Sequence, residues 1–289
     1  MKAVCRIALA CLCVMMVFMA SPVMGEECVF LGTDSNEWGD GDNWDCGHSP
    51  DSDDTAEIPV NKICTLNGAD ADALNLVMAP SSYLLIPKGS QLNLHGEGYE
   101  EESIINGQIK FVTGNSDDDP VLYFTGDHTM AHSVLPHSDA IFGQVKGIVA
   151  GDSGKTLSIG AYPEGQFELT GNLDIQIALN LVGVVRAGTG YTITLSTNPK
   201  TGNGGLIQAA GGTVIVNTDV NAHVDFKTNA SGCVQFNVEI GDLTGDFIVK
   251  GGNLEVNDVL CTTGFLLFCD GGTISVADGA TATFSGSCP

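Results

Sequence analysis

The stretch from Asp34 to Asp45, "DSNEWGDGDNWD", is dense in side chains that bind metal ions. Carboxylate and amide oxygens are the hard ligands that Ca²⁺ prefers in proteins. The sequence therefore suggests a calcium site whose ligands come from Asp34, Asn36, Asp40, Asp42 and Asp45. No cofactor is certain from the sequence, and Ca²⁺ is the one that it suggests most clearly. The stretch is not an EF-hand, because Trp38 stands where the fifth-position ligand belongs and no helices flank it.

A second group, in "GDHTMAHSVLPHSD", brings His128, His132 and His137 together in the sequence. Imidazoles at close spacing suggest a zinc or copper site. However, the glutamate of the helical zinc-hydrolase motif is missing, and Pro136 indicates a loop. The alternative is that these are solvated loop histidines, and we favour it.

Catalytic carboxylates are harder to find. Asp219 and Glu239 are twenty residues apart and would stack on one face of a repeating fold. Such a pair suits a retaining glycoside hydrolase, but it equally suits an exposed acidic ladder. We assign no catalytic residue and do not expect an enzyme.

The charge balance limits the choice of partner. The chain has 11 Lys and Arg against 35 Asp and Glu, a net charge of −24. An acidic surface of this kind repels nucleic acid and anionic membranes, so neither is expected as a partner. It favours cations. With 43% apolar residues the chain still has enough material for a folded core.

The first 25 residues have the pattern of a secretory signal peptide. Lys2 and Arg6 precede an apolar run, and cleavage is expected after Gly25. The alternative, a membrane anchor, is less favoured because the apolar run is short and interrupted. The mature protein is expected to be secreted, without membrane insertion.

A glycine-led segment recurs about every twenty residues. The segments start, at nearly equal steps, at Gly171, Gly190, Gly211, Gly232, Gly251 and Gly271. A fixed period of this size is typical of solenoids. Within each segment apolar and polar residues alternate, as in a half-buried strand. In "GGTISV", Ile274 and Val276 are expected to face inward, and in "GGNLEV", Leu254 and Val256.

We therefore expect an all-β fold, a right-handed parallel β-helix with an N-terminal cap. The predicted division is a signal peptide over residues 1–25, a capping segment over 26–70 and a β-solenoid over 71–289. The alternative is an antiparallel sandwich or barrel, which also has many short strands. The regular interval, and the lack of Asn-Gly turns flanked by clear hairpin arms, favour the solenoid.

Seven cysteines remain after the signal peptide. Outside the cell they should mostly pair, and the odd number leaves one free or bonded between chains. Cys269 and Cys288 are separated by nearly one period of the glycine repeat and are expected to lie on adjacent coils. Cys28, Cys46 and Cys64 are equally spaced at an interval slightly shorter than that period, which suggests the same geometry near the N-terminus.

The segment before the first coils has a distinctive series: Trp38, Asn43-Trp44, Gly47, Pro50 and "DTAEIP" from Asp54. It resembles the N-terminal segment of large secreted β-helical surface proteins, including autotransporter-like adhesins of bacteria, and more weakly the ectodomain of amnionless-type receptors. The resemblance covers about 30 of the 289 residues. It implies a β-helix with a capping segment and brings no catalytic residues with it. The two tryptophans suit a cap; the alternative is an aromatic sugar-binding platform.

These features favour a secreted, acidic structural or adhesive protein of an extracellular matrix, wall or surface coat. The expected partner is an extracellular polysaccharide or matrix component, bound by polar strand residues such as Thr192, Thr194 and Thr213. Asn229-Ala230-Ser231 is a glycosylation sequon. The alternative function is a polysaccharide lyase or glycoside hydrolase of the β-helix type.

Overall fold

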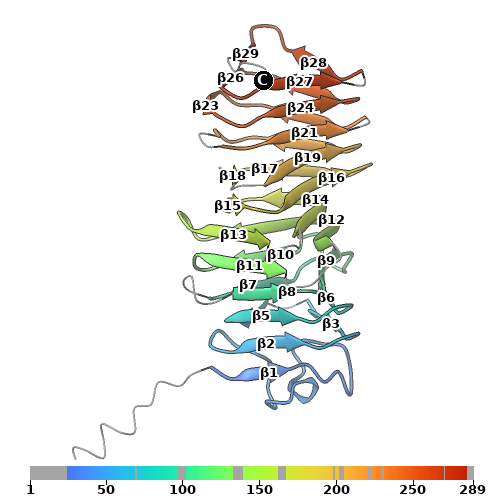
Figure 1. The fold of residues 1–289 in the computed structure, drawn as a ribbon. Helices are drawn as coiled ribbons and strands as arrows, with labels where there is room; N and C mark the ends of the chain where they lie inside the picture. Colours follow the sequence, from blue (N-terminus) through green and yellow to red (C-terminus); the bar gives the residue numbers. More distant parts are fainter. Residues whose placement is uncertain are drawn as a thin grey trace, which may run out of the picture.

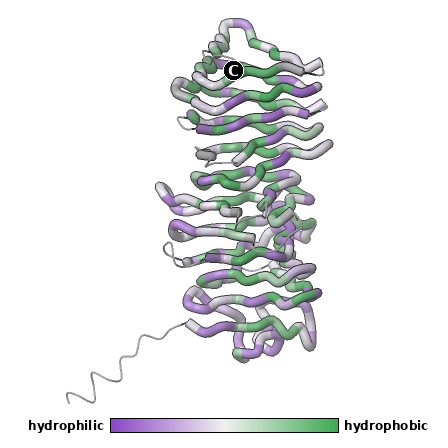
Figure 2. The backbone as a smooth tube through the Cα atoms, viewed as in Figure 1, coloured by the Kyte–Doolittle hydropathy of each residue, from purple (hydrophilic) through white to green (hydrophobic). Residues whose placement is uncertain are grey.

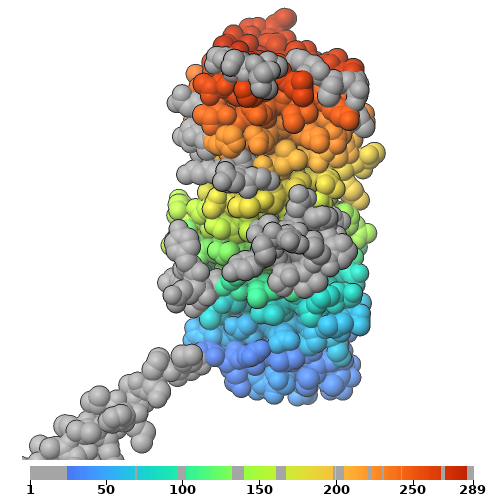
Figure 3. Space-filling model, in the orientation of Figure 1, coloured from blue at the N-terminus to red at the C-terminus, as the bar shows by residue number. Residues whose placement is uncertain are grey.

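The computed structural model describes residues 25–68, 70–96, 102–132, 139–161, 167–197, 199–201, 205–220, 223–229, 231–269 and 271–284. These residues form a parallel β-helix, a rod of stacked coils around one apolar interior (Figure 1). Successive coils follow one another from blue to red along the rod in Figure 3. The named strands of the described part pair in parallel, so the solenoid prediction is confirmed and the antiparallel alternative is wrong.

One side of the rod is an eight-stranded sheet. Its strands are β1 (Glu27–Val29), β2 (Thr55–Ile58), β5 (Asn75–Met78), β8 (Glu102–Ile105), β11 (His128–His132), β13 (Thr156–Ala161), β15 (Ala178–Leu181) and β18 (Pro199–Thr201). A three-stranded sheet lies on the same side nearer the C-terminus (Figure 1). It consists of β23 (Ile240–Leu243), β26 (Val259–Thr262) and β29 (Thr281–Phe284).

The rest of the rod is an 18-stranded sheet built from two columns. The first column contains β3 (Ile63–Thr65), β6 (Tyr83–Pro87), β9 (Gln108–Val112), β16 (Val184–Gly188), β19 (Leu206–Ala210), β21 (Phe226–Asn229), β24 (Phe247–Lys250) and β27 (Leu266–Cys269). The second contains β4 (Asp70–Ala73), β7 (Gln91–Leu94), β10 (Val121–Phe124), β17 (Thr192–Leu195), β20 (Thr213–Val216), β22 (Cys233–Phe236), β25 (Asn253–Val256) and β28 (Thr273–Val276). Two long strands, β12 (Asp139–Gly151) and β14 (Glu168–Ile175), pair with both columns and join them.

Side chains alternate between the interior and the surface along strands such as β20, β22 and β25, and the hydropathy along the tube alternates accordingly in Figure 2. Val214, Val234 and Leu254 lie in register on three consecutive coils and are at most 1% exposed. Stacking therefore buries an apolar column that a single coil would leave open to water. The inward orientation predicted for Leu254 and Val256 is confirmed.

Each glycine pair has two separate roles at the corner before a second-column strand. The first glycine takes a positive φ, +90° at Gly211 and +65° at Gly251, which L side chains rarely adopt. The second lies against the neighbouring coil. A Cβ added to Gly212 or Gly252 would lie 2.1 or 2.4 Å from a carbonyl oxygen there. The "GG" pattern thus serves both the turn and the close stacking.

An aromatic cluster in the segment between β1 and β2 covers the N-terminal end of the rod. Trp38 and Trp44 are each 2% exposed, and their rings meet edge to face with centroids 4.9 Å apart. Phe30 packs on Trp44 in the same manner at 5.1 Å, and the indole N–H of Trp44 donates to the carbonyl of Trp38 at 2.7 Å. The cap is confirmed. Because both indoles are buried, they do not form a sugar-binding platform.

The stack begins earlier in the chain than the predicted division has it. β1, β2 and β3 already belong to the coils, so the boundary set at residue 70 falls at the first residue of β4. The signal-peptide prediction concerns residues 1–25, of which 1–24 lie outside the described residues.

The N-terminal cysteines need a correction. Cys28 and Cys46 form a disulfide with a Cα–Cα distance of 5.2 Å, while Cys64 is free and buried. The bond does not join stacked coils, because the in-register neighbour of Cys28 on the next coil is Ala56. It closes the cap loop instead. The predicted Cys269–Cys288 pairing lies outside the described residues.

Candidate functional site

The acidic residues of the cap lie in the loop around the short 3₁₀ helix η1 (Gly41–Asn43). Asp45 accepts a hydrogen bond from the backbone N–H of Val29 at 2.6 Å. Asp40 accepts from the N–H of Asp42 at 3.2 Å and from the hydroxyl of Ser35 at 3.4 Å. The loop thus uses these two carboxylates to satisfy its own donors.

The structure does not gather all five predicted calcium ligands into one described cluster. Asp34, Asn36, Asp42 and Asp45 are exposed, and Asp40 is half-buried. A hollow of about 300 Å³ beside the loop includes only Asp40 from this set, together with Glu37, Trp38, Gly39, Leu66, Asn67, Asp70 and Ala71. Calcium binding stays a prediction.

Asn43, which was named in the Asn-Trp pair of the sequence but not among the candidate site residues, organises the acidic loop. It is fully buried, and its amide nitrogen donates to Ser35 Oγ at 2.7 Å and to the Glu37 carbonyl at 3.0 Å. Its amide oxygen accepts from the backbone N–H groups of Asp34 and Ser35 at 3.3 and 3.2 Å. The sequence feature that could have identified Asn43 is its place in the Asn-Trp pair before the first coils.

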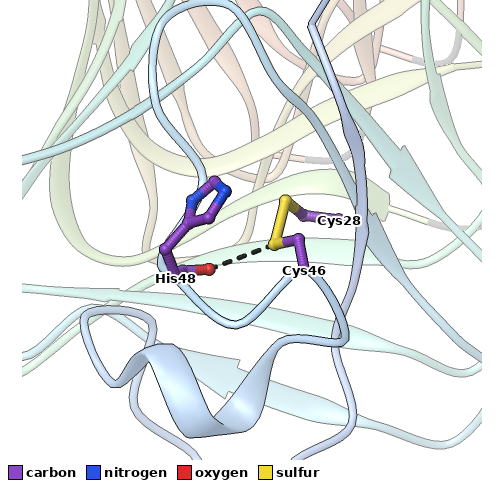
Figure 4. A group of neighbouring side chains, drawn as sticks. All are labelled: Cys28, Cys46 and His48. Carbon is purple, nitrogen blue, oxygen red and sulfur yellow. Dashed lines mark hydrogen bonds between the residues drawn. A yellow bond between two sulfur atoms is a disulfide. The ribbon is translucent and has the colours of Figure 1, made fainter.

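Cys28, Cys46 and His48 form a compact group, with one sulfur or nitrogen atom of each within 4.8 Å of the others (Figure 4). The two sulfurs are bonded to each other, so they offer no thiolate to a metal. The backbone carbonyl of Ser49 raises the pKa of His48, and Asp54 and Glu26 add to this effect. Asp54 Oδ2 and Glu26 Oε2 lie 3.8 and 3.7 Å from its ring nitrogens. The arrangement is a disulfide beside a solvent-facing, protonatable imidazole.

His128 is not a solvated loop residue. It begins β11, points inward and is 2% exposed. The Ser103 hydroxyl lies 2.8 Å from its Nε2 and accepts from the backbone N–H of Leu76 at 2.9 Å, so the hydroxyl proton is free to go to His128. Burial lowers the pKa of His128 to about 4, which keeps the ring neutral at neutral pH. The solvated-loop interpretation is therefore wrong for this residue. His137 lies outside the described residues, so the predicted triad stays a prediction.

The second column presents an ordered polar surface from β17 to β28. We name it the amide–hydroxyl face; its outward side chains are Thr192, Thr194, Thr213, Ile215, Cys233, Gln235, Asn253, Glu255, Thr273 and Ser275, with Asn217, Asn237 and Asn257 following three of the strands. The strands pair without a register shift from coil to coil, so equivalent side chains form straight rows. Glu255 is the one charged side chain in this set.

Hydrogen bonds between coils fix many of these side chains. Asn257 donates to Asn237, and Asn237 donates to Asn217, each at 2.9 Å. The hydroxyls of Thr273 and Ser275 both donate to the amide oxygen of Asn253, at 3.0 and 3.2 Å. The result is a row of held donors and acceptors at the roughly 4.8 Å spacing of paired strands.

Two free thiols, those of Cys233 and Cys261, lie in the C-terminal part of the rod. Cys233 is half-buried on the amide–hydroxyl face, and burial together with the nearby Glu255 carboxylate raises the pKa of its thiol. Cys261 borders a hollow of about 210 Å³ next to Thr262 and Thr283. Cys64, the third free thiol, has its pKa raised by burial. An intermolecular disulfide stays a prediction.

The carboxylates weighed for catalysis, Asp219 and Glu239, are in the turns that follow β20 and β22. The hydrogen bond seen at Asp219 involves its backbone and not its carboxylate: the Thr218 hydroxyl donates to the Asp219 carbonyl at 3.5 Å. Neither carboxylate borders the two hollows described above.

No helix of the described residues is long and apolar enough to cross a membrane. The chain was compared with protein-family models, with curated proteins and with solved structures, and none of the three comparisons found a match. The fold and the geometry of its own side chains therefore carry the functional argument.

Proposed function

We propose that this is a secreted structural or adhesive protein of an extracellular matrix, wall or surface coat, and that its amide–hydroxyl face binds polysaccharide. The observation that carries the proposal is the register of that face. Five consecutive coils present hydroxyl and amide groups in straight rows, and hydrogen bonds between coils hold several of them in place.

Such a surface suits an extended, hydroxyl-rich polymer. Sugar hydroxyls both donate and accept hydrogen bonds, as Thr, Ser and Asn side chains do. The rows repeat at the spacing of paired strands, so a polymer lying along the rod meets equivalent groups on each coil. Side chains that are already ordered lose little conformational entropy on binding. The acidic remainder of the surface keeps the rod soluble and favours bound cations.

A binding assay with a matched control tests this proposal. Wild-type protein is sedimented with insoluble neutral and acidic polysaccharides, beside a triple variant Thr192→Val, Thr194→Val and Thr213→Val. Valine keeps the shape and β-propensity of threonine and removes the hydroxyl. The control variant Thr55→Val, Thr129→Val and Thr156→Val makes the same changes in the eight-stranded sheet, where these residues are also partly exposed.

We expect at least one polymer to retain the wild type and the control, and the first variant to bind roughly tenfold more weakly, a loss of about 1.4 kcal/mol. Equal binding by the two variants would refute the role of this face. If no polymer retains the wild type, and soluble sugar products accumulate instead, the alternative of a polysaccharide lyase or hydrolase replaces the proposal.

A further inference from the structure

Cys28, Cys46 and His48 in the cap are side chains of the kind that bind Zn²⁺. One ligand atom of each lies within 4.8 Å of the other two (Figure 4). In a tetrahedral Zn²⁺ site two thiolate sulfurs lie about 3.8 Å apart, because each Zn–S bond is about 2.3 Å long. The Cα atoms of the two cysteines are 5.2 Å apart, so rotation of their side chains brings both sulfurs to that separation once the disulfide is open.

Hydrogen bonds hold the two cysteines side by side without the help of the disulfide. The backbone N–H of Asp45 donates to the Val29 carbonyl at 3.0 Å, and the Asp45 carboxylate accepts from the N–H of Val29 at 2.6 Å. Two residues further on, the N–H of Leu31 donates to the Asn43 carbonyl at 2.6 Å. Reduction of the disulfide therefore removes one covalent bond and leaves this pairing in place.

The imidazole of His48 has the orientation of a metal ligand. Its Nδ1 lies 3.0 Å from the backbone carbonyl of Ser49, to which this nitrogen donates when it carries the proton. Histidine ligands commonly donate their other ring N–H to a carbonyl in this way, and Nε2 is then available to a metal. Glu26 Oε2 lies 3.7 Å from Nε2, close to the roughly 3.3 Å between nitrogen and oxygen ligands of tetrahedral Zn²⁺. Glu26 thus offers a fourth ligand.

We propose that reduction of the Cys28–Cys46 disulfide creates a Zn²⁺ site, whose ligands are the two thiolates, His48 Nε2 and the Glu26 carboxylate. The reductant is a dithiol. One of its sulfurs attacks Cys46 Sγ, which is partly exposed, and the fully buried Cys28 leaves as a thiolate.

The second sulfur of the reductant then displaces Cys46. The dithiol ends as a disulfide after supplying two electrons and two protons, and the two cysteines end as thiols. Zn²⁺ releases the two thiol protons when it binds. The closed disulfide leaves no thiolate for the metal, so the redox state of the cap controls Zn²⁺ binding.

This inference goes beyond the proposed function and is tested separately, by titration of the purified protein with Co²⁺. The protein is reduced with dithiothreitol and freed of reductant without air. We expect one tightly bound Co²⁺ per reduced chain, with sulfur-to-metal charge-transfer absorption that added Zn²⁺ removes. The oxidised protein should show no such absorption. Trp38 and Trp44 are the only tryptophans of the chain, and their fluorescence should not change on reduction, because the cap stays folded.

Variants assign the ligands. Cys46→Ser should abolish the charge-transfer absorption, and His48→Gln should weaken Co²⁺ binding at least tenfold. Cys233→Ser is the matched thiol control, because Cys233 is a partly buried thiol near a carboxylate. His223→Gln is the matched histidine control, because its Nε2 lies 3.5 Å from an aspartate oxygen. Both controls should bind Co²⁺ as the wild type does.

Three results would overturn the proposal. One is a reduced wild type without sulfur-to-metal absorption, or one that binds Co²⁺ no better than the oxidised protein. Another is wild-type Co²⁺ binding by Cys46→Ser or His48→Gln. The third is a change in tryptophan fluorescence on reduction that Zn²⁺ does not reverse, since the cap would then have lost the geometry of the site.

Discussion

His128 makes the stability of the rod depend on pH. Its folded-state pKa is about 4, below the ordinary value of 6.5, so the unfolded chain takes up a proton first as the pH falls. The free energy of unfolding is therefore expected to decrease as the pH drops from about 6.5 to about 4, by up to about 3 kcal/mol from this residue. Urea denaturation of the wild type and of His128→Gln across this range measures the contribution as a difference.

Met130→Leu is the control for this experiment, since Met130 lies inward on the same strand as His128 and has no titratable group. It should keep the pH dependence of the wild type, whereas His128→Gln should flatten it. If His128→Gln has the same pH profile as the wild type between pH 6.5 and 4, the neutral buried imidazole has no part in stability.

Asn43 is the residue on which the acidic loop depends most. Replacing it by alanine removes two donated and two accepted hydrogen bonds of a fully buried side chain. We expect Asn43→Ala to lower the free energy of unfolding by roughly 3 kcal/mol. The exposed Asn36→Ala should change it by less than about 0.5 kcal/mol. Equal denaturant midpoints for the two variants would contradict this role.

At the scale of the element, the two glycine positions of a corner should differ in sensitivity. Gly190 has a φ of +82° and open space where a Cβ would lie, so Gly190→Ala costs only backbone strain, about 1 kcal/mol. In Gly212→Ala the new Cβ would lie 2.1 Å from the carbonyl oxygen of Gly188, and the coils must separate. We expect a cost of roughly 3 kcal/mol there. Thermal melts compare the two, and a Gly212→Ala melt as mild as that of Gly190→Ala would rule out the close-stacking role.

The coil pattern was predictable because stacking imposes one length on every coil. Regular steps between glycines indicated the parallel strands from Gly171 onward, and alternation indicated the inward columns. The same reasoning failed at Cys28 and Cys46, because the cap inserts extra chain into that coil. Cys28 lies in register with Ala56, which is much further along the chain than Cys46, so the equal spacing of the cysteines had no meaning for stacking there.

His128 shows the limit of reading polar residues one by one. Pro136 indicated a loop, but His128 and Met130 occupy inward positions of β11. A polar side chain can fill an inward position when a hydroxyl on the neighbouring strand bonds to it, as Ser103 does. That partner is far away in the sequence, so only the fold reveals the pair.

At the scale of the whole molecule, the parallel pairing that builds the rod also lines up the amide–hydroxyl face. A long polymer that lies along the rod meets equivalent groups on consecutive coils. Several weak contacts on one rigid surface then act together, and the whole surface binds more tightly than any single coil would.

In-register parallel stacking is the claim on which this account rests, and the free thiol of Cys233 allows a direct test. Thr213 lies opposite Cys233 on the adjacent coil, whereas Ile215 lies opposite Gln235 and is therefore offset from Cys233 along the strand. Paired strands are roughly 4.8 Å apart, within the Cα separation that a disulfide accepts. After oxidation at alkaline pH, where the Cys233 thiol ionises, peptide mapping of Thr213→Cys should show a disulfide between the introduced thiol and Cys233. The same mapping of Ile215→Cys should show no bond to Cys233. A bond to Cys233 in the Ile215→Cys variant, or in neither variant, would contradict the stacked register.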